Sequence, residues 1–324
     1  MIEKLDTYLR GKTVLITGGT GSFGHQMTDE LLKFDVKEVR ILSRGEDLQH
    51  KMAIEYPDKR LNFVIGDVRD YQRVLEATRN VDVIFNAAAL KQVPDCETHP
   101  LEAVKTNILG AYNVKEAAII NEVPTVMTIS TDKAVKPINA MGMTKALQEK
   151  VMTADEMHVH TTKFLVIRYG NVIGSRGSVI PLFKERVQKR LSLYVTDFRM
   201  TRFMLTLKDA TQLAFKALLE GKGNEIFVLK RPACLIKDLA EVMAKGEVKV
   251  LEGKIRPGEK IHETLVQEDE MRRVVEEEEY YIIHPYGTKD VPKLKTTLLE
   301  YTSENAHRLD KDGIRVLIEK AGYL

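Results

Sequence analysis

The chain has 324 residues, and its 49 basic side chains nearly balance 47 acidic ones, giving a net charge of +2. This balance excludes the broad basic surface of nucleic-acid-binding proteins. No apolar run reaches the ~18 residues of a membrane span, and the polar N-terminal segment lacks the apolar stretch of a signal peptide. The 2 cysteines lack the spacing of a disulfide framework or a metal site. We therefore expect a cytoplasmic protein that binds neither nucleic acid nor membranes and holds no structural metal.

The first 180 residues alternate short runs rich in Val and Ile with segments of helical periodicity. Short apolar runs without strict alternation are typical of parallel strands buried on both faces. The predicted strands are Thr13–Thr17, Glu38–Leu42, Asn62–Ile65, Val81–Asn86, Thr125–Ser130 and Lys163–Arg168. The predicted helices are Gly24–Phe34, Glu46–Tyr56, Tyr71–Thr78, Pro100–Asn121 and Met143–Asp155. This alternation predicts an α/β fold with a doubly wound parallel sheet, the Rossmann fold, over residues 1–180.

From residue 181 to 324 the regular alternation of strand and helix stops. The pattern predicts helices at Lys208–Glu220, Ile236–Ala244 and Asn305–Ala321, and strands at Asn224–Leu229, Val248–Val250 and within Val274–Ile283. We expect a smaller α+β part that binds the substrate. Segments of this part can return to the first domain, so the boundary is soft.

A glycine-rich turn with the spacing GxxGxxG connects the first predicted strand to the first long helix. Glycines allow a tight turn and a close approach to a pyrophosphate, whose charge the helix N-terminus then stabilises. The alternative is a turn that only packs. The strand before it and the helix after it favour a cofactor site formed by Gly18, Thr20, Gly21, Ser22, Phe23 and Gly24.

The end of the second strand distinguishes between the two nicotinamide cofactors. NAD-binding proteins usually place an acidic residue there, on the ribose 2′-hydroxyl. Here Ser43 and Arg44 supply a hydroxyl and a guanidinium, which suit a 2′-phosphate, so we expect NADP in preference to NAD. Alternatively, Arg44 is simply exposed or stacks on the adenine. The third and fourth strands end in further candidate cofactor contacts: Asp67, Val68, Ala87 and Ala88.

The fifth predicted strand leads into Thr131, Asp132 and Lys133, and eight residues later Met141 precedes Lys145 at i, i+4 spacing. In this arrangement the chain resembles extended short-chain dehydrogenases/reductases that act on nucleotide sugars. In that superfamily a strand-end Ser or Thr and a Tyr-x-x-x-Lys pair face the nicotinamide. Met141 stands at the position of that Tyr, and a thioether does not exchange a proton. Three interpretations remain: an inactive relative, a shifted alignment, or a subgroup that works without the Tyr, which we favour.

Three further segments resemble the UDP-N-acetylglucosamine 4,6-dehydratases that invert C5. They are residues 88–94 (AALKQVP), 131–137 (TDKAVKP) and 168–181 (RYGNVIGSRGSVIP). A capsular and O-antigen branch of that family carries Met in place of the Tyr, and residues 301–310 (YTSENAHRLD) resemble its tail. The resemblance spans most of the chain. It implies a role in surface polysaccharide synthesis and a homo-oligomer, a dimer or hexamer, packed through two of the predicted helices.

The resemblance also implies a reaction in three stages. NADP oxidises C4 of the sugar, water leaves across C5–C6, and the hydride returns to C6. By resemblance, Asp132 protonates the leaving 6-hydroxyl and Lys133 takes the C5 proton, while Thr131 hydrogen-bonds the C4 hydroxyl. We expect Lys145 and the positive nicotinamide to lower the pKa of Lys133. Without the Tyr, Lys133, Lys145 or a water is left to accept the C4 hydroxyl proton.

The UDP end of the substrate is expected to contact the smaller part. Basic side chains and backbone N–H groups are candidates for the diphosphate, and a carboxylate is a candidate for the uridine ribose. These residues are Lys91, Asn171, Ser178, Val179, Arg202, Arg256 and Glu259. Two other functions stay open. A UDP-sugar 4-epimerase uses the same oxidation but returns the hydride to C4, and a non-catalytic protein would only bind NADP.

Overall fold

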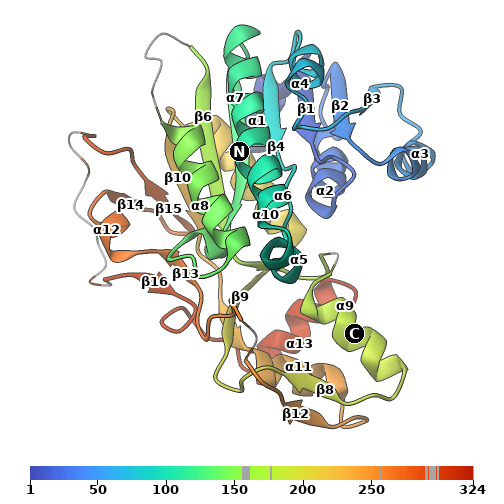
Figure 1. The fold of residues 1–324 in the computed structure, drawn as a ribbon, viewed down its shortest axis with the longest axis vertical. Coiled ribbons are helices and arrows are strands. Elements are labelled where there is room, and N and C mark those ends of the chain that lie inside the picture. Colours follow the sequence, from blue (N-terminus) through green and yellow to red (C-terminus); the bar gives the residue numbers. More distant parts are fainter. Residues whose placement is uncertain are drawn as a thin grey trace.

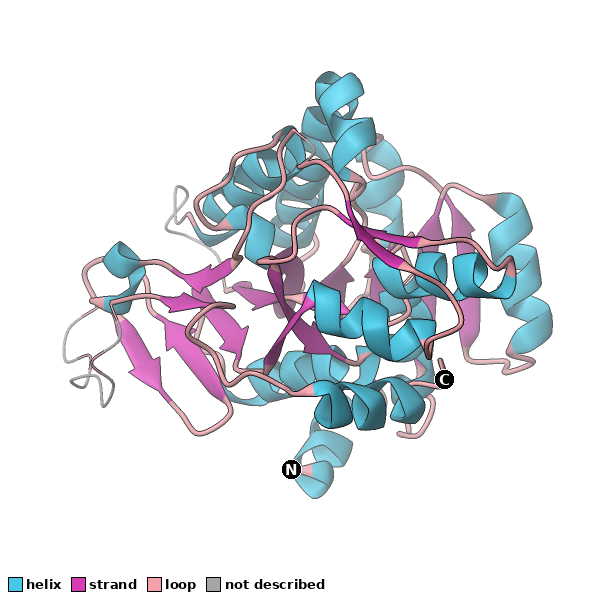
Figure 2. Ribbon diagram, turned by 90° about the horizontal axis from the view of Figure 1, so that it is seen from below, coloured by secondary structure: helices cyan, strands magenta, loops and turns pink. Residues whose placement is uncertain are grey.

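The computed structural model describes residues 1–154, 161–175, 177–255, 257–288, 291, 297 and 299–323. A central sheet with helices on both faces forms the larger part, and a smaller part lies at one end of it (Figure 1). The same layers are visible from below in Figure 2. The predicted α/β doubly wound fold is therefore confirmed. Within these described residues, no helix is long and apolar enough to cross a membrane.

Among the described residues, the central sheet has nine strands, and its seven strands from β10 to β3 run parallel. Most of their side chains are buried on both faces, as the Val- and Ile-rich runs predicted, except on the edge strand β3, where none is fully buried. In spatial order the strands are β14 (Val274–Glu276), β15 (Tyr280–Ile283), β10 (Glu225–Leu229), β6 (Lys163–Tyr169), β5 (Thr125–Thr131), β4 (Val83–Asn86), β1 (Thr13–Thr17), β2 (Glu38–Ser43) and β3 (Leu61–Ile65).

Two helical layers bury the faces of this sheet in two separate apolar cores. One layer holds α4 (Tyr71–Ala77), α7 (Gly110–Ile120) and α8 (Ala140–Thr153). The other holds α1 (Ile2–Leu9), α2 (Ser22–Leu31), α3 (Glu46–Glu55) and α10 (Leu207–Glu220). Short helices α5 (Val93–Thr98) and α6 (Pro100–Ala103) precede a π-helical turn at Val104–Leu109 that runs directly into α7. The single predicted helix Pro100–Asn121 is thus α6, this turn and α7.

Side-chain caps fix where several helices begin. Asp70 accepts a hydrogen bond from the backbone N–H of Arg73 at the start of α4. Asn139 accepts one from the backbone N–H of Gly142 at the start of α8. Such caps satisfy N–H groups that have no partner within the helix. The cap of α8 matters for function because that helix carries Met141 and Lys145.

The smaller part has its own apolar core, and the described residues form three small sheets besides the central one. Two of these sheets lie in the smaller part, with strands β7 (Asn171–Val172), β8 (Leu193–Val195), β9 (Thr201–Leu205), β11 (Ala233–Leu235) and β12 (Val250–Glu252). Its helices are α9 (Val179–Gln188), α11 (Ile236–Ala244) and α13 (Lys311–Lys320). The third sheet, formed by β13 (Thr264–Val266) and β16 (Tyr301–Thr302), and the short helix α12 (Glu268–Met271) pack into a core of the central sheet. Helix α13 is shorter than the predicted Asn305–Ala321. Strands β10, β14 and β15 and helix α10 lie beyond residue 181 yet return to the central sheet.

A buried ion-pair cluster joins the sheet, helix α8 and the C-terminal segments. Arg168 on β6 is 2% exposed, and its guanidinium lies 2.5 Å from Glu149 Oε2 on α8 and 2.9 Å from Glu270 Oε2 on α12. Its Nη1 also donates to the carbonyl oxygen of Leu265. Glu149 in turn accepts a hydrogen bond from Ser130 Oγ at the end of β5. One cation therefore holds two carboxylates from distant parts of the chain.

Replacement of Arg168 by Ala should lower the free energy of unfolding by about 3–5 kcal/mol, because it leaves two buried carboxylates without their cation. Urea denaturation measures this loss. Arg10→Ala is the control, since its pair with Asp6 lies on the surface and should cost less than about 1 kcal/mol. Equal losses in the two variants would contradict the structural role of the buried cluster.

Candidate active site

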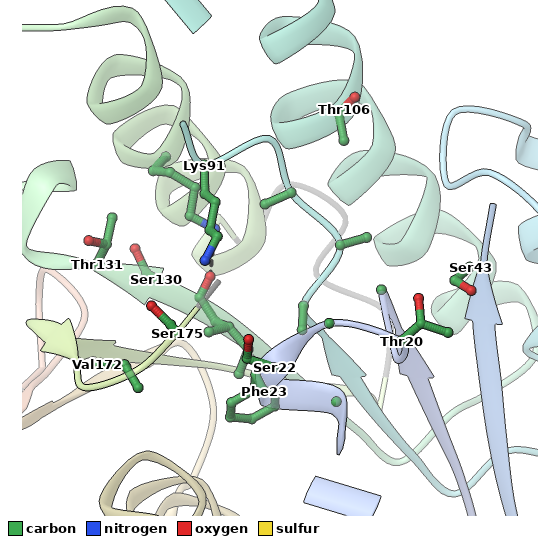
Figure 3. A pocket seen from close by; sticks show the side chains of 18 of the residues that line it. Thr20, Ser22, Phe23, Ser43, Lys91, Thr106, Ser130, Thr131, Val172 and Ser175 are labelled. Atoms are coloured by element: carbon green, nitrogen blue, oxygen red, sulfur yellow. Dashed lines mark hydrogen bonds between the residues drawn. The ribbon is translucent and has the colours of Figure 1, made fainter. Parts of the chain in front are cut away.

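A cleft of about 690 Å³ lies at the carboxyl ends of the parallel strands, between the central sheet and the loop after β7. Ligands in open α/β sheets bind at this edge. Its lining brings together the glycine turn, the ends of β2, β4 and β5, and helix α8 (Figure 3). The sequence predictions had placed nucleotide and sugar chemistry on these same segments, and the fold assembles them in one cavity.

The glycine turn forms one wall of the cleft, and two of its glycines leave no room for a side chain. Gly18 has φ +64°, and a Cβ there would lie 2.8 Å from Ala88 Cα. A Cβ on Gly24 would lie 2.0 Å from Gly19 O. The backbone of the turn therefore packs tightly against the loop after β4 and leads into the N-terminus of α2, as a pyrophosphate site requires. Thr20, Gly21, Ser22 and Phe23 also line the cleft, so this wall fits a dinucleotide.

The far end of the cleft carries the residues that were expected to select the cofactor. The Arg44 side chain is 55% exposed, and its Nη1 lies 3.8 Å from Asp67 Oδ2. Asp67 has a closer partner in Arg69, at 2.6 Å. Burial would raise the pKa of Asp67, but Arg69 and Arg44 hold it below its ordinary value. Ser43 is buried, and its Oγ accepts a hydrogen bond from Gln49. Arg44 is thus the more accessible of the two expected phosphate contacts, and Val68 lines the wall between them and the centre of the cleft.

The loop after β4 reaches the centre of the cleft. Thr17 Oγ1 accepts from the Ala88 backbone N–H, and both Ala87 and Ala88 line the cavity. Asn107, within the π-helical turn, bonds both backbone groups of Leu90. This fixes the loop just before Lys91, whose side chain extends into the cavity (Figure 3).

Asp132 and Lys133 form an ion pair at the end of β5. Asp132 is fully buried, and its Oδ1 accepts from Lys133 Nζ at 3.0 Å and from Thr131 Oγ1 at 2.9 Å. Thr131 and Lys133 line the cleft. Burial raises the pKa of the Asp132 carboxyl, and the nearby charge of Glu263 raises it further. A carboxyl whose pKa is raised in this way accepts a proton more readily, which suits a general acid.

The expected lowering of the Lys133 pKa is wrong for this structure. Burial would lower it, but the carboxylates of Asp132 and Glu263 outweigh burial and raise the pKa above its ordinary value. Lys145 is not among the groups that shift it. The reason is that the two carboxylates lie within 3.5 Å of Lys133 Nζ, while Lys145 bonds to other partners.

Met141 and Lys145 lie on one face of α8 and both line the cleft. Met141 packs with Cys96 and Ala103 in a small apolar cluster and offers no proton. Lys145 Nζ donates to the carbonyl oxygen of Ile129 at 2.5 Å and to Gln148 Oε1. Burial lowers the pKa of Lys145 to about 8, against the opposing effect of Glu149. Lys145 therefore becomes neutral close to physiological pH.

The expected substrate contacts divide into two groups. Asn171 and Ser178 line the cleft, and Val179 begins helix α9 beside them. Arg202 lies outside this lining, is 9% exposed, and donates to the backbone carbonyl oxygens of Thr201, Lys260 and Ile261. Its guanidinium thus holds the smaller part together in this structure. Glu259 follows Gly258, whose carbonyl accepts from Asn139. Arg256 lies outside the described residues.

Two residues of the site were missed by sequence reasoning. Tyr169, at the end of β6, lines the cleft, but burial raises the pKa of its hydroxyl, so it is a poor proton acceptor. Glu263 lies 3.5 Å from Lys133 Nζ. It lies 130 positions after Lys133 in the sequence, and only its place directly before the apolar run of β13 hinted that this charge is buried.

Comparison with known proteins places the chain in a family. Residues 14–285 match the family described as polysaccharide biosynthesis protein, and the chain belongs to that family. A protein of Rickettsia bellii named UDP-glucose 4-epimerase is 44% identical over 333 residues, 97% of each chain. An uncharacterised membrane protein of Methanocaldococcus jannaschii is 40% identical over the full length of both chains.

Solved structures agree on the fold. Pen from Bacillus thuringiensis superimposes with a TM-score of 0.90 at 39% identity, over 97% of this chain and 99% of that one. The dTDP-glucose 4,6-dehydratase DesIV from Streptomyces venezuelae, with NAD and TYD bound, gives a TM-score of 0.69 over 77% of this chain and 86% of that one. At 22% identity the second likeness supports the fold alone.

The expectation that Arg44 contacts the 2′-phosphate of NADP predicts that Arg44→Ala weakens NADP binding about 10–100-fold, because a charged hydrogen bond would be lost. Binding of NAD should change little. Fluorescence titration with each cofactor measures both. Arg73→Ala is the matched control, since Arg73 lies on α4 and donates to the carbonyl oxygen of Ile65 outside the cleft. An equal effect on both cofactors would contradict a 2′-phosphate contact.

Proposed function

We propose that this member of the polysaccharide biosynthesis protein family is an NADP-dependent UDP-N-acetylglucosamine 4,6-dehydratase that inverts C5. It would work in the cytoplasm and supply a 4-keto-6-deoxy sugar for surface polysaccharides. The observation that carries this proposal is the Asp132–Lys133 pair, an acid and a base 3.0 Å apart beside the glycine turn of a dinucleotide-binding fold. Elimination of water requires such a pair, whereas an epimerase has no use for it.

The cofactor and the substrate would lie at opposite ends of the cleft. Gly18, Thr20 and Gly21 would hold the pyrophosphate of NADP, and Arg44 its 2′-phosphate. When bound, NADP supplies the reversible oxidation with which the reaction begins and ends. Lys91, Asn171 and Ser178 line the end that remains for the UDP-sugar.

Lys145 is the group we assign to the C4 hydroxyl proton. Met141 cannot take it, and the carboxylates of Asp132 and Glu263 raise the pKa of Lys133, which makes Lys133 a weaker base candidate for this first step than Lys145. The pKa of Lys145 is about 8, so a useful fraction of its amine is neutral in the cell. Thr131, whose hydroxyl donates to Asp132, offers its oxygen to the same region of the cleft and would orient the C4 hydroxyl.

One proton transfer within the ion pair prepares the elimination. Movement of a proton from Lys133 Nζ to Asp132 Oδ1, across 3.0 Å, converts ammonium and carboxylate into amine and carboxylic acid. The amine then takes the C5 proton, the C6–O bond breaks, and the Asp132 proton leaves with the hydroxyl as water. The original ion pair is restored. Burial, which raises the Asp132 pKa and penalises both charges, favours this transfer, while the charge of Glu263 opposes loss of the Lys133 proton.

Association between copies would involve helices α7 and α8. These helices pack side by side, and apolar side chains on them and on the preceding turns are exposed: Leu101, Leu109, Ile120, Met143 and Leu147. Large apolar side chains left exposed on neighbouring helices are a feature of protein interfaces. We therefore propose a homo-oligomer, a dimer or hexamer, joined through this face.

The decisive experiment is incubation of the pure protein with NADP and UDP-N-acetylglucosamine in deuterated water, followed by NMR and mass spectrometry. A dehydratase gives a product lighter by one water, with a methyl group at C6 and deuterium at C5. Coupling constants at C5 then report whether that centre is inverted. Asp132→Asn should abolish water loss, since an amide is no acid. An unchanged mass with any sugar nucleotide would contradict the proposal.

A UDP-sugar 4-epimerase is the second candidate, favoured by the name of the Rickettsia relatives. It would convert UDP-N-acetylglucosamine or UDP-glucose into the C4 epimer without loss of mass. The same NMR experiment detects that product by its changed coupling at C4. Cofactor binding with no change in any sugar would instead favour a non-catalytic protein.

The pH dependence tests the role of Lys145. Because the pKa is lowered to about 8, the neutral amine is scarce below that pH and predominates above it. The rate of C4 oxidation should rise about tenfold per pH unit up to pH 8 and then level off. Lys145→Arg, which stays charged, should lower the rate about 10²–10⁴-fold. Lys150→Arg on the same helix is the control, and a flat profile through pH 8 would contradict the assignment.

A further inference from the structure

Two carboxylates from different parts of the chain hold the Lys133 ammonium. Asp132 Oδ1 lies 3.0 Å from Lys133 Nζ and Glu263 Oε1 lies 3.5 Å from it. Glu263 directly precedes β13, which packs against the short helical turn Asp132–Ala134. Its backbone N–H donates to Ser303 Oγ at 2.9 Å, so the main chain below the carboxylate is fixed.

Glu263 is itself buried among cations. It is 2% exposed, with Arg202 Nε at 3.7 Å and Lys260 Nζ at 3.8 Å. Together with Asp132, these are the charged groups that surround Lys133 and Glu263 in the described part of the chain. Burial would raise the pKa of Glu263, but Lys133, Arg202 and Lys260 lower it below its ordinary value. These three cations therefore favour the charged form of Glu263.

The segment that carries Glu263 is also tied to the loop after Lys133. Asn139 Nδ2 donates to the carbonyl oxygen of Gly258 at 2.8 Å, and Lys260 Nζ donates to that of Val135 at 2.6 Å. Gly258 has φ +80°, and a Cβ there would lie 2.9 Å from Asn139 Cβ, so the two segments are in close contact. These contacts hold the Glu263 carboxylate at a fixed distance from the ion pair.

One oxygen of each carboxylate is buried without a hydrogen-bond donor. Among the described residues, neither Asp132 Oδ2 nor Glu263 Oε2 accepts a hydrogen bond. A buried acceptor without a donor is rare and calls for an explanation. The charge of Glu263 favours a proton on Asp132, and it also opposes loss of a proton from Lys133.

We propose that Glu263 is a positioning residue that clamps the Lys133 amine against Asp132 and sets the pH at which this acid–base pair loses a proton. Glu263 acts through Lys133 and Asp132 and takes no part in bond making. This role rests on the function proposed above, in which Asp132 is the acid and Lys133 the base. The electrostatic clamp itself is a property of the protein without ligands.

Competitive labelling measures the clamp directly. The full-length protein, without cofactor or substrate, is treated with acetic anhydride over a range of pH, and mass spectrometry follows the peptide that contains Lys133. The midpoint of its reactivity gives the pH at which the amine becomes neutral. Glu263→Gln removes the charge at nearly constant shape and should lower the Lys133 midpoint by about one to three pH units.

Two further variants make the sign of the effect testable. Lys260 and Lys133 both lie close to the Glu263 carboxylate, and their positive charges repel each other. Lys260→Met removes one of these charges, so it should raise the labelling midpoint of Lys133. Glu276→Gln is the matched control, because it removes a carboxylate that pairs with Lys230 at 2.8 Å, away from Asp132 and Lys133. It should leave the Lys133 midpoint unchanged. If Glu263→Gln does not fold, the direction in which Lys260→Met shifts the Lys133 midpoint tests the proposal in its place.

The pH dependence of dehydration completes the test. The rate of dehydration of UDP-N-acetylglucosamine is measured against pH for the wild type and for Glu263→Gln. The part of the pH–rate profile that reports proton loss from the Asp132–Lys133 pair should move to lower pH in the variant. The size of this shift should equal the shift of the Lys133 labelling midpoint. An unchanged Lys133 midpoint in Glu263→Gln, or a lowered one in Lys260→Met, would overturn the inference. A shifted midpoint in a protein that dehydrates no sugar would leave the clamp standing and contradict the proposed function instead.

Discussion

A single buried guanidinium determines how the parts of this protein fit together. Arg168 neutralises Glu149 and Glu270 where water does not reach, and removal of any one of the three would leave an uncompensated charge in the interior. Glu149 lies one helical turn after Lys145 and also accepts from Ser130. The same cluster therefore fixes the helix that carries Lys145, the strand that leads to Asp132, and the segment after Glu263.

The two lysines of the cleft, Lys133 and Lys145, have pKa values that are shifted in opposite directions. Lys145 has burial acting against its charge and only one carboxylate nearby, so its pKa falls to about 8. Lys133 is buried too, but two carboxylates outweigh burial, and its pKa rises. When the surroundings of titratable groups move their pKa values in opposite directions in this way, one site can hold an acid and a base together. The difference lies in the neighbours of each amine, because the side chains are chemically identical.

Local patterns predicted the larger part of the fold well. The strands and helices predicted up to residue 180 were found within a few residues of their predicted ends, because buried parallel strands and amphipathic helices leave strong periodic signals, but the short helices α1 and α5 were not predicted. The glycine turn, Asp132, Lys133 and Lys145 were likewise identified from spacing within one segment. What the sequence could not reveal were the contacts between distant segments: Glu263 beside Lys133, or Arg202 turned toward backbone carbonyls. These depend on how the smaller part packs, and no local pattern encodes that.

The path of the chain has a consequence for how ligands reach the cleft. Strands β10, β14 and β15 return from the smaller part to the central sheet, and Arg168, Lys133 and Asn139 are each bonded to segments beyond residue 257. Two lobes joined at so many points cannot swing apart about a hinge without breaking buried ion pairs. Entry of a ligand and escape of a product would instead depend on rearrangement of loops at the mouth, such as the one after β2. Turnover would then be limited by the mobility of a few surface residues, while the interior stays rigid.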